Sequence, residues 1–306
     1  MLKVEVDVFS GRPNPVWIMT DLDAIESLLA TAAEADAMAK PGAGYRGLGF
    51  REVRIEVIGD DGLRRRRGPR EFALASTAAG NFRQSVALGR RLIESMPVRS
   101  EIRLMQHQVT PLSDKLRDRL LERLAEYLAH PPRRRPKRTP PEPPNPLRTT
   151  VADPDCDNCR YEVSQFNPAF WNRPEVQPHN NCYNYGRNWR TDTFAQPGRA
   201  HGAGTDDMSC PAVTTAAMAD GLKHRCTCLP DSEYPRRLMA LVIDPDFDYH
   251  WYRHQRGGFW GHKPGNGAAR NVDNSNAVIT SPETCDRGTY TQFCGYFYAG
   301  VSVVIS

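Results

Sequence analysis

Three residues of this chain have the types and the order of a thiol-based catalytic site. Cys182 follows Asn180 and Asn181, polar residues that are typical of a helix N-terminus. At a helix start, the amide dipoles lower the pKa of a thiol and the N–H groups can bind an oxyanion. His250 and His262 lie farther along, in two short aromatic-rich segments. The sequence therefore predicts a nucleophile, a general base and a residue that orients the base.

The two segments that carry the histidines are predicted to form one β-hairpin. Residues 249–253 and 259–263 are rich in aromatic side chains, and Gly257-Gly258 between them supplies turn chemistry. This turn places position 250 nearly opposite position 262 or 263, close enough for the imidazole of His262 to fix the tautomer of His250. The alternative is that both rings pack in an aromatic sheet and form local hydrogen bonds only.

This order of residues resembles that of papain-like thiol hydrolases, and the use of a second histidine resembles NlpC-type peptidases and CHAP amidases. The resemblance covers residues 177–265. It implies that Cys182 is the nucleophile, His250 the general base and His262 the residue that orients the base. It also implies cleavage of an amide bond through an acyl-enzyme, with a peptide or peptidoglycan-like substrate and no cofactor for catalysis.

The chain departs from those families on both sides of the predicted site. Tyr183-Asn184-Tyr185 follows the cysteine, where small residues are usual. Asp248-Tyr249 precedes the first histidine, where glycine is common. These departures limit the resemblance to the level of the fold.

Side chains around the predicted site could bind a substrate. Gln177, His179 and Asn180 could each add a donor to an oxyanion hole. Five aromatic residues, predicted to be exposed, would line a cleft and stack on sugar or peptide: Tyr183, Tyr185, Trp189, Trp251 and Trp260.

All eight cysteines lie beyond residue 150, and two close pairs stand out. Cys156 with Cys159, and Cys226 with Cys228, could supply four thiolates to a tetrahedral structural zinc site. The alternative is that these cysteines form disulfides that staple a loop-rich domain. The sequence shows no secretory leader, which favours zinc, and the disulfide alternative stays open.

The number of cysteines determines how many can be unpaired. If Cys182 is free, seven cysteines remain, so at least one more is unpaired or a ligand. Cys285 and Cys294 flank residues 286–290 and could close that loop by a disulfide.

The part of the chain before the cysteines predicts a small α+β domain over residues 1–130. Alternation of apolar residues predicts strands at 2–9 and 51–58. Helical periodicity predicts helices at 21–37, 81–96 and 113–128. This part has no cysteine and no cluster of catalytic residue types. We interpret it as a recognition or scaffold module that could bind a partner protein.

The rest of the chain is predicted to form a linker and a second domain. Residues 131–150 are rich in proline and arginine, which predicts an extended linker. Residues 151–306 are predicted to form a papain-like α+β domain in which N-terminal helices pack on an antiparallel sheet. Within it, Cys210–Leu222 predicts a helix and the apolar run Arg237–Ile243 predicts a central strand.

The composition is that of an ordinary soluble globular protein, with 306 residues, 40% hydrophobic and 25% charged. No apolar run approaches the roughly 18 residues needed to span a bilayer. Basic runs at 64–67 and 133–138 supply much of the net charge of +4; we interpret them as solvated loops, so nucleic acid is not the expected partner. The charged N-terminus predicts a cytoplasmic protein, or one exported without a recognisable signal peptide.

Two functions of different classes are compatible with this sequence. The first is a cysteine peptidase or amidase in residues 151–306. The second is a non-enzymatic two-domain binding protein whose C-terminal module is held together by zinc or by disulfides. The reactivity of Cys182 and the metal content of the protein distinguish the two.

Overall fold

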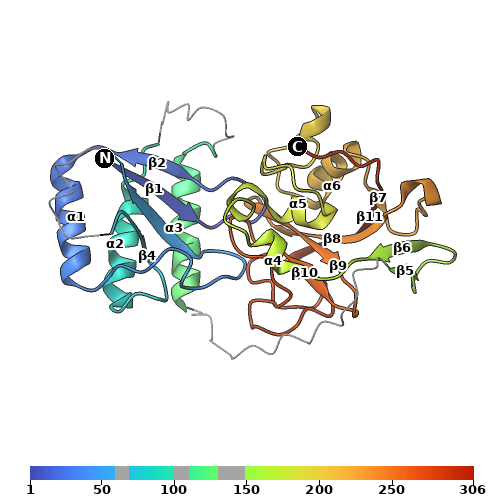
Figure 1. The fold of residues 1–306 in the computed structure, drawn as a ribbon. Coiled ribbons are helices and arrows are strands. Elements are labelled where there is room, and N and C mark those ends of the chain that lie inside the picture. The colour runs from blue at the N-terminus through green and yellow to red at the C-terminus, as the bar shows by residue number, and fades with distance from the viewer. Residues whose placement is uncertain (59–68, 99–109, 130–148) are drawn as a thin grey trace. The chain divides into compact units, whose positions relative to one another are not determined.

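The computed structural model describes residues 1–58, 69–98, 110–129 and 149–306 (Figure 1). Helices and antiparallel sheets occur together, which confirms the predicted α+β class. Both basic runs, and the predicted linker as far as residue 148, lie outside the described residues.

Two compact units divide the chain. The first contains Met1–Phe9 and Pro13–Pro132, and the second contains Ser10–Arg12 and Arg133–Ser306. The second unit therefore includes three residues from near the start of the chain, flanked on both sides by residues of the first unit.

The first unit is built on a four-stranded antiparallel sheet in the order β2-β1-β3-β4. Its strands are β1 (Leu2–Asp7), β2 (Val16–Met19), β3 (Glu52–Val57) and β4 (Glu71–Leu74). Leu2, Val4 and Val6 are fully buried, whereas Lys3 and Glu5 between them are partly buried. This alternation places one face of β1 in the core, as the sequence pattern predicts.

Three helices complete the described part of the first unit: α1 (Leu22–Glu34), α2 (Phe82–Glu94) and α3 (Asp114–Ala129). The side chain of Asp21 caps α1, and that of Asn81 caps α2. All three helices are confirmed within a few residues of their predicted bounds. Strand β2 was not predicted, because four residues are too few for an alternating pattern to be recognised.

A buried ion network lies at the end of β1. The Asp7 carboxylate, 1% exposed, accepts from Arg51 Nη2 at 2.6 Å and from Arg54 Nη2 at 2.6 Å. Arg51 is itself 2% exposed. Burial alone would raise the pKa of Asp7, but the two guanidinium groups hold it well below its ordinary value. The folded first unit therefore contains an ionised and fully paired Asp7.

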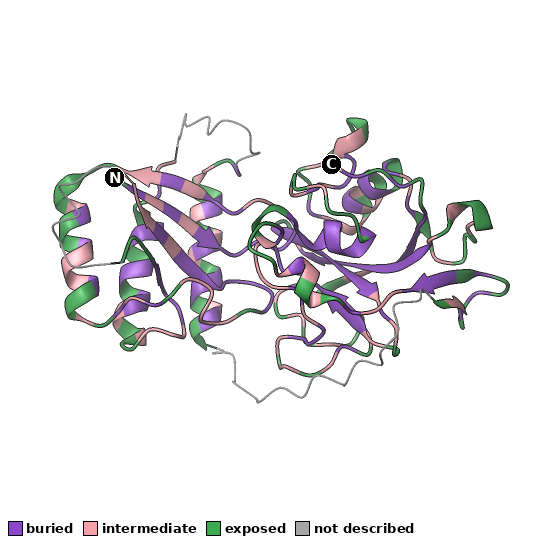
Figure 2. Cartoon of the chain, viewed as in Figure 1, coloured by how far each residue is buried: buried purple, intermediate pink, exposed green. Residues whose placement is uncertain are grey.

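The second unit is built on a five-stranded antiparallel sheet in the order β10-β9-β8-β11-β7. Its strands are β7 (Lys223–His224), β8 (Arg237–Asp244), β9 (Asp248–His254), β10 (Trp260–His262) and β11 (Gln292–Ala299). Every residue of the middle strand β8 is buried, as Figure 2 shows. The predicted central strand and the predicted hairpin of β9 and β10 are confirmed.

A separate hairpin precedes this sheet, formed by β5 (Thr149–Ala152) and β6 (Arg160–Val163). The helices that follow are α4 (Pro168–Trp171), α5 (Cys182–Arg187) and α6 (Cys210–Ala219), with 3₁₀ turns η2 (Gln177–His179), η3 (Arg199–His201) and η4 (Asp231–Glu233).

One face of the large sheet is covered by α5 and α6. Tyr183 of α5 and Val213 of α6 share a hydrophobic cluster with Met239 and Leu241 of β8 and Trp251 of β9. The predicted helix at Cys210 is confirmed, with Ser209 as its N-cap. Searching the described residues for a helix long and apolar enough to cross a bilayer finds none.

Candidate functional site

The helix predicted at Cys182 is confirmed and begins at this residue. The Asn181 side chain accepts from the N–H groups of Tyr183 at 3.0 Å and Asn184 at 3.1 Å. Asn184 Oδ1 in turn accepts from the Asn181 N–H at 3.1 Å. This reciprocal capping box fixes the start of α5 and so holds Cys182 in the first turn.

Cys182 is a buried thiol outside any disulfide. It is 0% exposed and belongs to the same core cluster as Tyr249 and Trp251 of β9. Burial raises the pKa of the Cys182 thiol well above its ordinary value, and the nearby Asp248 carboxylate raises it further. The folded chain therefore favours the protonated thiol, which is a poor nucleophile.

His250 and His262 form a hydrogen-bonded pair. His250 Nε2 lies 2.9 Å from His262 Nδ1, and His262 Nε2 lies 3.0 Å from the carbonyl oxygen of Val272. Burial, helped by Arg270, lowers the pKa of His262 to about 3, so this ring is neutral. Because a carbonyl only accepts, neutral His262 carries its proton on Nε2 and accepts on Nδ1 from the N–H of His250.

The pairing register of the hairpin differs from the prediction in one respect. His262 lies opposite Tyr252 rather than opposite His250. The two histidines therefore meet diagonally across the strands, a distance that ring side chains can span.

The structure brings the two histidines together but does not bring them to Cys182. Along β9, Tyr249 and Trp251 point to the face that carries Cys182. Since successive side chains of a strand alternate, His250 points to the other face, where its ring contacts His262. The sheet lies between the sulfur and the imidazole, so the predicted nucleophile and base are not adjacent in this conformation.

The three predicted oxyanion-hole residues lie in and after η2. Asn180 is 0% exposed, and its side-chain amide donates to Val176 O and to Asp192 Oδ1, both at 2.8 Å. Gln177 Nε2 donates to the carbonyl of Asn266 at 3.0 Å. His179 is exposed. The amide groups of Asn180 and Gln177 are thus engaged in holding loops of the second unit.

The predicted exposed aromatic cleft is wrong for four of its five members. Tyr183, Tyr185 and Trp251 are fully buried, and Trp260 is 6% exposed. Trp189 differs, at 39% exposed. The four buried rings fill the core because they lie on elements packed against or within the sheet, where aromatic area is removed from water.

Lys263 is a buried group that sequence reasoning passed over. Its Nζ donates to the carbonyls of Gln177 and Gly265, each at 2.6 Å, and to the carbonyl of Asn180. Three carbonyl oxygens replace the hydration of the ammonium group and connect η2 with the end of β10. A lysine directly after an aromatic strand was the available signal.

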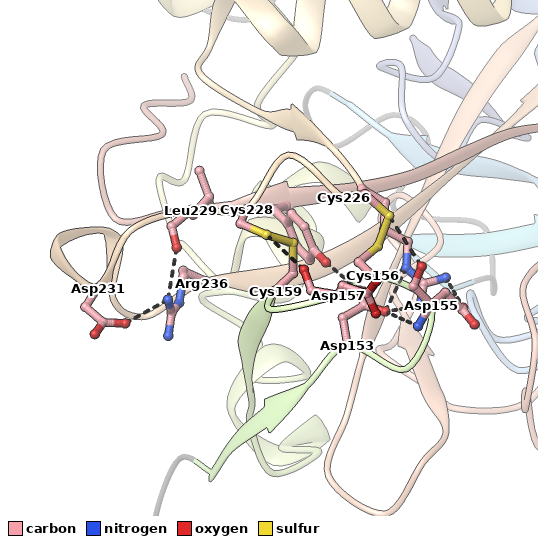
Figure 3. Close-up of a disulfide and its surroundings, with 12 residues drawn as sticks. Asp153, Asp155, Cys156, Asp157, Cys159, Cys226, Cys228, Leu229, Asp231 and Arg236 are labelled. Atoms are coloured by element: carbon pink, nitrogen blue, oxygen red, sulfur yellow. Dashed lines mark hydrogen bonds and ion pairs between the residues drawn. A yellow bond between two sulfur atoms is a disulfide. The ribbon is translucent and has the colours of Figure 1, made fainter.

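The four cysteines predicted to hold zinc form two disulfides instead (Figure 3). Cys156 bonds to Cys226 and Cys159 bonds to Cys228, across 70 and 69 residues of sequence. The zinc prediction is wrong, because each sulfur is bonded to another sulfur and is no longer a thiolate ligand. In the described parts of the chain, no group of three or more His, Cys, Asp or Glu side chains is placed to hold a metal ion.

A third disulfide joins Cys210, the first residue of α6, to Cys294 in β11. Cys285 is a free thiol like Cys182, so the predicted Cys285–Cys294 bond is wrong, whereas the expected second unpaired cysteine is present. Disulfides are typical of oxidising compartments outside the cytoplasm, which agrees with the exported alternative and not with the cytoplasmic one.

Ion pairs reinforce the two neighbouring disulfides, Cys156–Cys226 and Cys159–Cys228, which we call the paired disulfides. Arg225 Nε donates to Asp153 Oδ2 at 2.9 Å, and Arg225 Nη1 lies 2.6 Å from Asp155 Oδ2. Covalent and ionic links thus hold the turn between β5 and β6 to the loop after β7.

Asp248 organises a site that the sequence did not reveal. Its fully buried carboxylate accepts from three successive N–H groups, those of Ser10 at 2.5 Å, Gly11 at 3.2 Å and Arg12 at 3.2 Å. The Tyr290 hydroxyl donates to the same carboxylate at 2.5 Å. We call Ser10–Arg12 the docked tripeptide. It lies 236 to 238 residues from Asp248 in sequence, and its composition predicted only a turn.

Gly11, the middle residue of the docked tripeptide, is held by three hydrogen bonds to its carbonyl group. The Gly11 carbonyl accepts from Asn181 Nδ2 at 2.8 Å, from Gln196 Nε2 at 2.8 Å and from the Tyr249 hydroxyl at 3.1 Å. A Cβ at Gly11 would lie only 2.4 Å from the Tyr249 ring. Glycine is therefore the residue that fits at this position without displacing the ring.

A curated protein is similar to part of this chain. The chain is 43% identical over 137 residues to insoluble matrix shell protein 1 of Ruditapes philippinarum. The match takes up 45% of this chain and 90% of the shell protein. No family model matches the chain, and no solved structure matches it. Since nearly the whole shell protein is matched at this level of identity, the chain belongs to the family of insoluble matrix shell protein 1.

Proposed function

We propose that this chain is a non-enzymatic structural protein of an insoluble extracellular matrix, with a disulfide-stapled second unit. The observation that carries the proposal is the 43% identity to a matrix protein, 90% of whose length is matched. This function develops the binding-protein alternative that the sequence left open.

Two structural observations support it. The three disulfides suit a protein that must persist outside the cell, where no reducing system maintains free thiols. Cys182 is fully buried and its thiol pKa is raised by burial, which suits a core residue better than a nucleophile.

Fractionation of the source tissue or culture tests the proposal. An antibody against the chain should detect it in extracellular material that resists salt and detergent, and a denaturant with a reductant should release it. Recovery of the chain from the soluble cytoplasmic fraction, with all eight cysteines reduced, would defeat the proposal.

The thiol hydrolase remains a second candidate because two specific observations favour it. A free cysteine opens α5, and His250 is hydrogen-bonded to His262 at 2.9 Å. This function would require a conformation in which Cys182 and His250 reach the same side of the sheet. Iodoacetamide mapping of the native chain at neutral pH decides between the candidates.

A structural role predicts that Cys182 is alkylated only after denaturation, while the more accessible Cys285 serves as the internal control. The hydrolase predicts rapid native labelling of Cys182 and loss of amide cleavage in Cys182→Ala. Native labelling at Cys182 that outpaces Cys285 would argue for the enzyme.

A further inference from the structure

The docked tripeptide occupies a site built for backbone recognition. Its three N–H groups converge on Asp248, and its middle carbonyl has three side-chain partners. The Ser10 carbonyl accepts from the Gly265 N–H at 3.0 Å, and Arg12 Nη1 donates to the Phe247 carbonyl at 2.9 Å. Nearly every backbone polar group of the tripeptide is thus paired inside the second unit.

The site is selective as well as polar. The Tyr249 ring would be 2.4 Å from any Cβ at position 11, so a residue other than glycine there must displace this buried ring. The Asp248 carboxylate is fully buried, and the tripeptide N–H groups supply most of its donors. Removal of the tripeptide would leave the buried Asp248 side chain without most of its hydrogen-bond donors, which disfavours the empty site. The site therefore strongly favours being filled by a segment of this sequence.

The occupant and its site come from opposite ends of the chain. The tripeptide partners named above all lie at Asn181 or later, whereas Phe9 and Pro13, which flank the tripeptide, belong to the first unit. Each copy of the chain therefore carries one donor segment and one acceptor site, contributed by segments far apart in sequence. A donor from a second copy presents identical chemistry to the acceptor.

We propose that the acceptor site of the second unit also binds Ser10–Arg12 of a second copy of this chain, so that copies associate by exchange of the docked tripeptide. The contact is heterologous: two copies can close into a reciprocal dimer, or successive copies can continue as an open chain. Intramolecular docking competes with exchange because each donor is covalently joined to its own acceptor, so exchange needs concentrated protein. This inference rests on the proposed function, since an insoluble matrix is a setting where the chain is concentrated.

Complementation between two full-length variants tests the exchange. Gly11→Val spoils the donor, because its side chain would overlap the Tyr249 ring, and leaves the acceptor intact. Asp248→Asn spoils the acceptor, because an amide NH₂ would face the tripeptide N–H groups, and leaves the donor intact. Neither variant can dock its own tripeptide, so a mixture has no intramolecular competitor.

We expect each variant alone to be monomeric and their equimolar mixture to form a species of twice the monomer mass, measured by light scattering after size exclusion. Two matched controls, mixed at the same concentration, chosen so that wild-type chain is monomeric, should form no such species: Gly204→Val, where a Cβ meets only Pro197 O at 4.0 Å, and the exposed Asp206→Asn. A folded pair of variants that stays monomeric in the mixture would overturn the proposal. Disulfide mapping and circular dichroism establish that both variants are folded.

A second measurement needs no variant. Wild-type chain should show concentration-dependent association, and a peptide spanning residues 8–14 should reverse it, whereas the same peptide with Gly11→Val should not. Wild-type chain that is monomeric up to its solubility limit would overturn the exchange. Fractionation of the matrix tests the proposed structural role separately, because a matrix protein could be retained there without exchange.

Discussion

The two units of this protein are stabilised by different chemistry. The second unit contains all eight cysteines and is cross-linked by three disulfides. The first unit contains no cysteine and instead buries Asp7 between Arg51 and Arg54. A cross-link acts chiefly by limiting the unfolded chain, whereas a buried ion network acts in the folded state and depends on every partner being present. The two units should therefore fail under different conditions.

Reduction should produce the largest difference between the units. For the loop closed by Cys210–Cys294, whose ends are 84 residues apart, loss of chain entropy in the unfolded state predicts about 4.5 kcal/mol of stabilisation. A phosphine reductant should therefore unfold the second unit or bring it close to unfolding. Peptide-level hydrogen exchange should show lost protection in β8 and β9 but unchanged protection in β1 and β3. Equal loss of protection in both units would contradict the expectation that only the second unit depends on disulfides.

Substitution of Asp7 should produce the opposite pattern. Asp7→Asn leaves Arg51, 2% exposed, without its anionic partner, and should destabilise the first unit by about 3 kcal/mol. Hydrogen exchange should then increase in β1 and β3 and stay constant in β8. Lys3→Ala is the matched control: the Lys3–Glu56 pair, 37% and 36% exposed, should contribute less than about 1 kcal/mol. If both variants lower the free energy of unfolding equally, the buried ion network contributes no more stability than the exposed ion pair.

Acid should reveal a smaller effect that is specific to the second unit. His262 has a folded-state pKa of about 3 and an unfolded-state value of 6.5. As the pH falls below 6.5, the unfolded chain binds a proton that the folded chain does not, so stability decreases until the folded pKa is reached. Between pH 7 and pH 5 this one group should lower the free energy of unfolding by about 2 kcal/mol.

The comparison that isolates this effect is urea unfolding of wild type and His262→Gln at both pH values. The variant should be less stable at pH 7 and should lose less stability on acidification. Parallel profiles for the two proteins would show that another group controls the pH dependence.

Local patterns in the sequence predicted much of the fold. Alternation identified β1, the apolar run identified β8, and Asn181 identified the start of α5. These features succeed because they depend on neighbours within a few residues. The hydrogen bond between His250 and His262 also followed from local geometry, since one turn connects their strands.

The remaining features depend on contacts between distant segments. Core packing decides which face of β9 is covered by α5. The spacing of residues along the sequence therefore could not predict that Cys182 and His250 lie on opposite faces of the sheet. Likewise, no spacing rule matches Cys156 to Cys226 rather than to a metal. The docked tripeptide is the extreme case, because its recognition residue Asp248 lies 238 residues from Ser10.

The paired disulfides have a consequence for damage and repair. Their cysteines are three positions apart in one loop, at Cys156 and Cys159, and two positions apart in the other, at Cys226 and Cys228. If one bond is reduced, its neighbour keeps the two released thiols near each other. When an external disulfide then oxidises one of these thiols to a mixed disulfide, the other thiol attacks it at high effective concentration, re-forms the bond and releases the external thiol. The connection between the two loops therefore stays closed when either one of the two bonds is reduced.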